Sequence, residues 1–224
     1  MNGLFLMLSI AISAQQLEAD LAAGELACPV CSGPLSRWGF ARSREIRTRD
    51  GVRSLRPRRA LCAECDTTHV LCPAWSLPRR RDSAEVIGEA LRLALDGDGH
   101  RRIASKLDRP PGTVRGWLRA ARRRAGELRA CATRQLVALD VQVGAVTPAG
   151  SELGDAVEAM MLAVRAFRLR FGAVDQAGVW ERAVWLTGGL LHGRPPPPRS
   201  APPAASGISP TREWVASLAG PAPV

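Results

Sequence analysis

Residues 100–119 read HRRIASKLDRPPGTVRGWLR, and this stretch decides the fold that the sequence predicts. Apolar side chains recur at helical spacing on both sides of the dipeptide Asp108-Arg109, which indicates two short helices joined by a tight turn. Pro111 suits the first turn of the second helix. Asp108 stands where such a turn usually has glycine, and aspartate tolerates a left-handed conformation better than most residues do. The spacing is that of a helix-turn-helix.

A third helix is predicted just before this pair. Ser83 is suited to cap its start, an apolar stripe at helical spacing follows over 86–95, and Gly97 and Gly99 end the helix. The residues expected to lie buried in the helix pair are Ile103, Ala104, Leu107, Val114, Trp117 and Leu118. Residues 82–134 are therefore predicted to form a homeodomain-like domain with a three-helix core.

Such a helix pair indicates double-stranded DNA as the partner, because its second helix enters the major groove. The residues expected to face the bases are Gly112, Thr113, Arg115, Gly116 and Arg119. The residues expected to contact phosphates are Arg101, Arg102, Lys106, Arg122, Arg123 and Arg124. Arginine can bond guanine through two donors, whereas phosphate contacts position a protein without reading the sequence. A plain basic helical bundle is the alternative interpretation.

The positive charge of the chain is concentrated around these helices. The 224 residues carry a net charge of +10, with Lys106 as the single lysine among many arginines. Residues 21–83 and residues 84–134 each have a net charge of +6, while residues 135–224 are neutral. A coding bias toward arginine would spread the charge evenly, so the uneven distribution favours a polyanion-binding face.

Two C-x-x-C pairs predict a second module. Cys28 and Cys31 form the first pair, Cys62 and Cys65 the second, and each has the spacing of a zinc knuckle. Two knuckles supply four thiolates to one tetrahedral ion, so we expect a structural Zn²⁺ with no open position for catalysis. A redox dithiol or disulfides are the alternatives. His69 could replace one thiol as a ligand, although a lone histidine there is more often a surface residue.

Residues 27–73 are predicted to fold as a zinc ribbon, with two knuckles, a hairpin and a third strand. Asp50-Gly51 is a strong turn dipeptide for the hairpin, and Gly33 suits the positive φ that often follows a knuckle. Trp38 and Phe40 are expected to pack on the ribbon, with stacking on nucleic acid as the alternative. The face that carries the arginines of the strands is either a solvated surface or a surface that contacts phosphates. The eight arginines are Arg42, Arg44, Arg47, Arg49, Arg53, Arg56, Arg58 and Arg59.

Three stretches carry a family resemblance. They are Cys28-Pro-Val-Cys31, Cys62-x-x-Cys65-x-x-x-His69, and the run from Ile103-Ala104 to Thr113-Val114-Arg115-Gly116-Trp117-Leu118. Together they resemble the N-terminal region of bacterial insertion-sequence transposases, in which a zinc ribbon precedes a homeodomain-like helix-turn-helix. The chain looks closest to uncharacterised bacterial proteins that keep this pair without a catalytic domain. The resemblance covers about residues 25–130, and it implies zinc ligation by the four cysteines and DNA contact by the helix from Gly112.

Residues 135–193 form the predicted C-terminal helical region. Helices over 151–171 and 174–191 are expected to pack as an antiparallel pair on an extension of the second DNA-binding helix over 119–146, or to form a homodimer. The acidic residues of this region lie on predicted helices, unlike the carboxylates of a nuclease fold. No phosphate loop or nucleophile elbow is found, so we expect no enzyme and no small-molecule substrate.

The two ends of the chain add little to a core. In residues 1–26, an apolar run over 4–13 precedes a short helical stretch over 15–23. The run is too short to span a bilayer and no base precedes it, so we expect a buried strand or helix turn rather than a signal peptide, with a misplaced start codon as the alternative. Residues 194–224 form a proline-rich tail that cannot build a core.

The predicted fold class is mostly α with a small β zinc ribbon. The predicted function is that of a non-catalytic DNA-binding protein in the cytoplasm, associated with the nucleoid and not with a membrane. A protein-interaction adaptor that uses the ribbon and the C-terminal helices is one alternative. A truncated transposase subunit that works with a separate catalytic chain is another.

Overall fold

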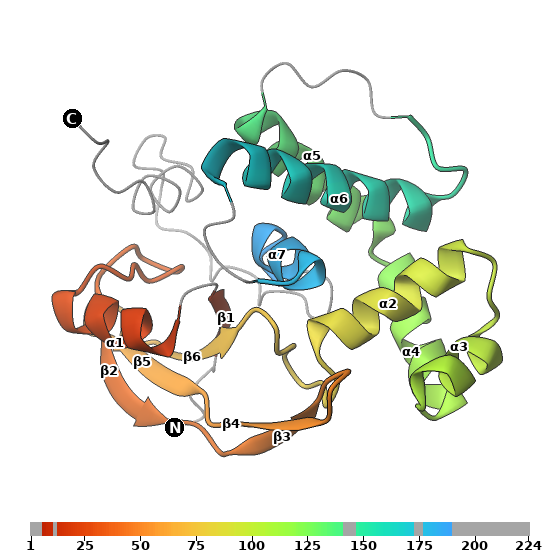
Figure 1. The fold of residues 1–224 in the computed structure, drawn as a ribbon. Coiled ribbons are helices and arrows are strands. Elements are labelled where there is room, and N and C mark those ends of the chain that lie inside the picture. Colours follow the sequence, from red (N-terminus) through yellow and green to blue (C-terminus); the bar gives the residue numbers. More distant parts are fainter. Residues whose placement is uncertain (1–5, 11–12, 141–146, 173–176, 190–224) are drawn as a thin grey trace.

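About half of the residues that the structure describes are helical, and the strands form one small sheet and one separate hairpin (Figure 1). The computed structural model describes residues 6–10, 13–140, 147–172 and 177–189. None of the helices in these ranges combines the length and the apolar character that a membrane-spanning helix requires. The expected combination of helices with a small β part is confirmed. The tail over 194–224 lies outside the described residues.

The sheet has four strands in the order β1-β6-β5-β2. β5 (Arg58–Cys62) pairs antiparallel with both β6 (Thr68–Pro73) and β2 (Leu35–Phe40). β1 (Leu6–Ile10) lies parallel to β6 at the edge. Residues 6–10 of the apolar run near the N-terminus therefore form a strand, which is one of the two conformations predicted for the run.

Helix α1 (Ala14–Ala23) packs on this sheet. Ser13 caps it by accepting a hydrogen bond from the Gln16 amide at 3.1 Å. Leu17 and Leu21 are its buried residues, and they join a small hydrophobic core with Leu26, Cys28, Leu35, Ala60, Cys62 and Leu71. Two of the eight buried members of this core are cysteines of the C-x-x-C pairs, so little apolar burial supports the β part on its own.

A separate hairpin connects β2 to β5. β3 (Arg44–Arg47) and β4 (Val52–Leu55) pair antiparallel around a turn that contains Asp50-Gly51, as predicted. Gly51 has a φ of +133°, a conformation that side chains rarely adopt. The hairpin is a two-stranded sheet of its own and is not part of the four-stranded sheet.

Three helices follow, at the predicted positions: α2 (Ala84–Leu95), α3 (His100–Leu107) and α4 (Pro111–Arg122). The Ser83 hydroxyl accepts from the Val86 amide at 3.4 Å and caps α2. Asp108 ends α3 with φ 52° and ψ 54°, which is the left-handed conformation expected of it. The predicted core residues of the pair are buried, except that Leu107 is partly exposed.

The chain breaks its helix after α4, and the expected extension through residue 146 is wrong. The backbone of Arg124 turns to φ −117° and ψ 7°, and a separate helix α5 (Ala125–Leu139) begins. The break allows Leu128, Ala132 and Leu136 of α5 to join the same core as α4. The last part of the expected extension, 141–146, lies outside the described residues.

Two further helices complete the helical part. α6 (Glu152–Phe171) confirms the predicted helix over 151–171, but it packs mainly along α5, as Figure 1 shows. α7 (Val179–Leu186) is shorter than the predicted 174–191, of which residues 174–176 and 190–191 are not described. α7 packs against both α6 and α2, so the C-terminal helices are joined to the predicted DNA-binding helices by one hydrophobic core.

Candidate functional site

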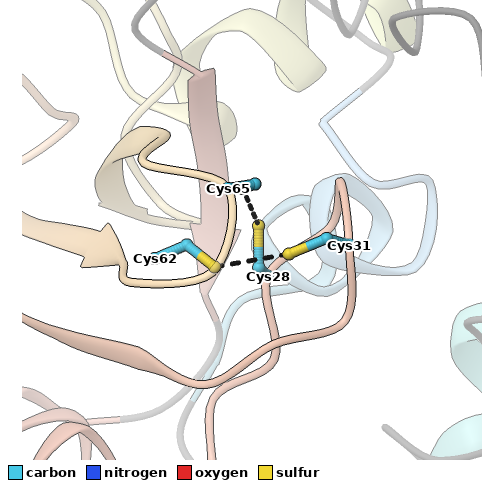
Figure 2. Close-up of side chains that lie close together, drawn as sticks. All are labelled: Cys28, Cys31, Cys62 and Cys65. Atoms are coloured by element: carbon cyan, nitrogen blue, oxygen red, sulfur yellow. Dashed lines mark hydrogen bonds between the residues drawn. The ribbon is translucent and has the colours of Figure 1, made fainter.

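The four cysteines of the C-x-x-C pairs converge on one point (Figure 2). Cys28 and Cys31 lie in a turn closed by the Ala27–Pro34 bridge, Cys62 is the last residue of β5, and Cys65 lies in the turn between β5 and β6. Their sulfurs all lie within 4.8 Å of one another, with 3.7 Å between Cys28 and Cys65 and 3.3 Å between Cys31 and Cys62. A tetrahedral ion with metal–sulfur bonds of about 2.3 Å would separate its sulfurs by about 3.8 Å. The cluster can therefore hold a metal ion.

Both cysteine turns contain a residue with a positive backbone φ at the equivalent position. Ser32 and Asp66, each the residue directly after the second cysteine of its pair, have positive φ values of 62° and 53°. The expectation that Gly33 has the positive φ is therefore wrong. A methyl group at Gly33 would fall 2.6 Å from the Glu64 carboxylate. Glycine at this position therefore leaves room for the Glu64 side chain.

The pKa values of the thiols differ from one position of the cluster to another. Burial raises the pKa of the Cys28 thiol. Partial loss of hydration and the neighbouring cysteines raise the pKa of the Cys31 thiol to about 12. Burial would also raise the pKa of Cys65, but hydrogen bonds from Thr67 and the cysteines outweigh it and lower the pKa to about 7. Several thiolates this close together repel one another, so they need a cation between them. A bound metal ion would supply that cation.

His69 lies beside this cluster and is fully buried, so the expectation of a surface histidine is wrong. Its Nε2 is 3.3 Å from the Cys28 sulfur, and burial lowers the pKa of the imidazole. Its position on β6 could have been found in the sequence, because strand alternation puts His69 on the same face as Leu71. Cys72 and Cys131 are buried away from this cluster.

The predicted base-contacting residues share the outer side of α4. Gly112, Arg115, Gly116 and Arg119 are exposed and Thr113 is partly exposed, whereas Val114, Trp117 and Leu118 are buried on the other side. No atom outside the local backbone lies within 4 Å of a Cβ added at Gly112 or Gly116. The structure therefore brings the five predicted residues to one accessible helix face.

The predicted phosphate-contacting residues divide into two groups. Arg101, Arg102, Lys106, Arg122 and Arg123 are exposed, and Arg124 is partly buried. Asp98 pairs with Arg102 at 3.3 Å and with Lys106 at 2.5 Å, an ion-pair network that the sequence did not indicate. These two bases are thus partly neutralised within the chain.

A buried carboxylate joins the β part to the helices. Asp82 is 2% exposed, and its two oxygens accept from Arg47 of β3 at 2.7 Å and from Arg109 of the α3–α4 turn at 2.6 Å. The backbone supports this contact, because the Arg47 amide donates to the Arg81 carbonyl at 2.7 Å. Arg81, directly before Asp82, is therefore bonded to the hairpin. Partners so distant in sequence leave no local signal.

The arginines and aromatic residues of the predicted ribbon lie at the surface to different extents. Arg42, Arg49, Arg53 and Arg56 are exposed, and Arg44, Arg47, Arg58 and Arg59 are partly buried. Trp38 and Phe40 are 52% and 47% exposed, so they pack on the β part less than expected. The Arg56 and Arg58 guanidinium groups lie over the Phe40 ring, at 4.9 and 4.4 Å from its centre.

A comparison with known protein families finds one family that matches part of the chain. A family described as a domain of unknown function (DUF6431) matches residues 28–109. The match contains the four cysteines, His69 and the Asp82 ion pairs, and it ends before α4. No curated protein and no solved structure matches the chain. Over residues 28–109 the chain is therefore similar to a domain of unknown function.

Proposed function

We propose that this protein is a zinc-stabilised, non-catalytic protein that binds double-stranded DNA. In this proposal, the cysteine cluster holds a structural Zn²⁺, and α3 and α4 act as a helix-turn-helix. The transposase-like resemblance of the sequence is consistent with this role, as a regulator or as a remnant of a mobile element.

The observation that carries the proposal is the two-sided character of α4. Its inner side is buried against the helical core through Val114, Trp117 and Leu118. Its outer side presents Arg115 and Arg119, one helical turn apart, with glycines that leave the backbone accessible. A helix that binds in the major groove needs this combination of a fixed inner side and an uncovered outer side with base-reading donors.

The zinc assignment rests on the donor set. Four thiolates at tetrahedral separations are the ligands of structural zinc, and they leave no position open for a substrate. Because the hydrophobic core of the β part is small, the metal would supply much of its stability, on the order of 10 kcal/mol. Asp82 would then hold the stabilised hairpin against the turn that precedes α4.

The test is duplex binding by the zinc-loaded full chain at several salt concentrations, measured by fluorescence anisotropy on a random-sequence pool. We expect log affinity to fall with log salt by about 0.9 for each phosphate neutralised. If the protein binds no duplex at low salt, the proposal is wrong. Binding-site selection on the same protein would then give the preferred sequence.

Two variants separate base reading from phosphate contact. Arg115→Ala is expected to reduce discrimination at one base position by about 1–3 kcal/mol. Arg123→Ala is expected to weaken binding to all sequences alike and to reduce the salt slope by about one unit. Arg165→Ala, an exposed arginine of α6, is the control and should change neither property. Equal effects of Arg115→Ala and Arg123→Ala on all sequences would remove the base-reading role.

A protein-interaction adaptor is the second candidate function. It is favoured by the exposure of Trp38 and Phe40 on β2 and by the family match, which includes the ribbon but ends before α4. Partner capture that survives nuclease treatment and is lost in Trp38→Ala would support the adaptor. Capture that requires DNA would support the first proposal.

A further inference from the structure

We propose that His69 is a positioning residue of the metal centre, which carries its proton on Nε2 and donates it to the Cys28 sulfur when that sulfur is a metal-bound thiolate. The inference rests on the proposed zinc binding and adds a residue outside the four ligands.

The backbone fixes the position of the imidazole. His69 lies on β6, an inner strand of the sheet. It pairs with Ala60 of β5 on one side and with Leu6 of β1 on the other. Its side chain is fully buried on the face that also carries Leu71. Because strands bound on both sides cannot shift separately, the ring stays beside the cysteine cluster.

The contact between the two side chains has the geometry of a hydrogen bond to sulfur. Nε2 lies 3.3 Å from the Cys28 Sγ. Which atom donates depends on the tautomer of the ring. A metal-bound cysteine has lost its proton, so in the loaded site only the imidazole can donate.

The other ring nitrogen indicates the same tautomer. Nδ1 is buried and has no hydrogen-bond partner among the described residues. A proton on Nδ1 would leave a buried donor without an acceptor, whereas a bare Nδ1 leaves only an unused lone pair. The proton is therefore better placed on Nε2, where the thiolate accepts it.

The donor is located at one of the two buried cysteines of the cluster. Cys28 and Cys62 are 2% and 0% exposed, whereas Cys31 is exposed and Cys65 is partly exposed. Besides His69, the Cys28 sulfur accepts from the Val30 amide at 3.4 Å. Zinc with four thiolates has a net charge of about −2, so a buried thiolate needs donors in place of water. His69 supplies one of them.

The four sulfurs form a complete ligand set without the imidazole. They lie mutually within 4.8 Å, and four ligands fill a tetrahedral structural site. This argues that His69 orients a ligand and does not replace one. Groups that orient metal ligands in this way typically contribute about 10–100-fold to metal affinity.

The test compares His69→Leu, His69→Gln and the control His100→Gln in the full chain, with zinc affinity measured by competition with a chelating indicator. We expect His69→Leu to weaken zinc binding by about 10–100-fold. His69→Gln, whose amide can still donate, should lose less, and His100→Gln should match the wild type. Equal affinity in all three variants would overturn the inference.

Two measurements keep the inference testable if His69→Leu does not fold. Nitrogen-15 NMR of the zinc-loaded wild type should show the proton on Nε2, and a proton on Nδ1 would contradict the inference. The visible spectrum of the Co²⁺-loaded chain should be that of four sulfurs and should persist in His69→Gln. A change in that spectrum would instead make His69 a ligand. A wild-type chain that binds no zinc would overturn the proposed zinc site as well.

Discussion

Asp82→Asn tests whether the buried carboxylate holds the two halves of the protein together. The substitution keeps the size of the side chain and removes its charge. It leaves one oxygen to accept from either Arg47 or Arg109, which both now donate to Asp82. One arginine therefore loses its partner next to a site that is almost inaccessible to water.

The magnitude follows from the exposure of the three side chains. Asp82 and Arg109 are 3% and 11% exposed, and loss of one partner of such a buried pair costs about 3–5 kcal/mol. Arg47 is 37% exposed, so water screens its pair and its share is below about 1 kcal/mol. Because asparagine retains one acceptor, we expect a loss near the lower end, about 3 kcal/mol of unfolding free energy.

The assay is urea unfolding of the zinc-loaded full chain, with Asp98→Asn as the matched control. Asp98 also joins two bases, Arg102 and Lys106, but these are 74% and 44% exposed. Water replaces the lost contacts there, so the control should lose much less stability than Asp82→Asn. If the two variants unfold at the same urea concentration, the structural role assigned to Asp82 is wrong.

Four further predictions concern other parts of the molecule. Gly88→Ala should destabilise the chain by about 1–3 kcal/mol in urea unfolding, because its new methyl group meets the Trp180 ring. Gly126→Ala, where the space is open, should instead stabilise it by about 0.5–1 kcal/mol, and a loss of stability there would contradict the packing described for α5. Asp108→Gly should raise stability by up to about 1 kcal/mol because the residue has a φ of 52°, and thermal unfolding that shows a decrease would refute this. Removal of the metal with a chelator should abolish the slow hydrogen exchange of β5 and β6 while most helical circular dichroism remains, and unchanged exchange would show that the β part does not depend on the ion.

The sequence predicts the features that depend on local geometry. The C-x-x-C spacing determines a turn, so the convergence of Cys28 and Cys65 requires only that the two turns meet. Helices α2 to α4 are predicted because their apolar residues recur at helical spacing and Ser83 and Pro111 mark their starts. The hairpin is predicted because few dipeptides other than Asp50-Gly51 suit its turn so well.

The sequence does not predict features that depend on distant partners. Residues 119–139 contain no proline and only one glycine, so nothing local marks the break at Arg124. The break is favoured by the burial of α5 against α6, which the sequence does not reveal. Asp82 is likewise 35 residues from Arg47 and 27 from Arg109. His69 is intermediate, since alternation indicates its face but not its contact with Cys28.

The packing of α2 between α4 and α7 determines how this protein can be cut for experiments. A fragment that stops at residue 134 would lack Trp180, which lies against Gly88, and would leave the apolar side of α5 open to solvent. Such a peptide would be expected to self-associate, and its weak binding would be misread as an inactive surface. Recombinant boundaries should therefore enclose the chain at least through Leu186, where α7 ends.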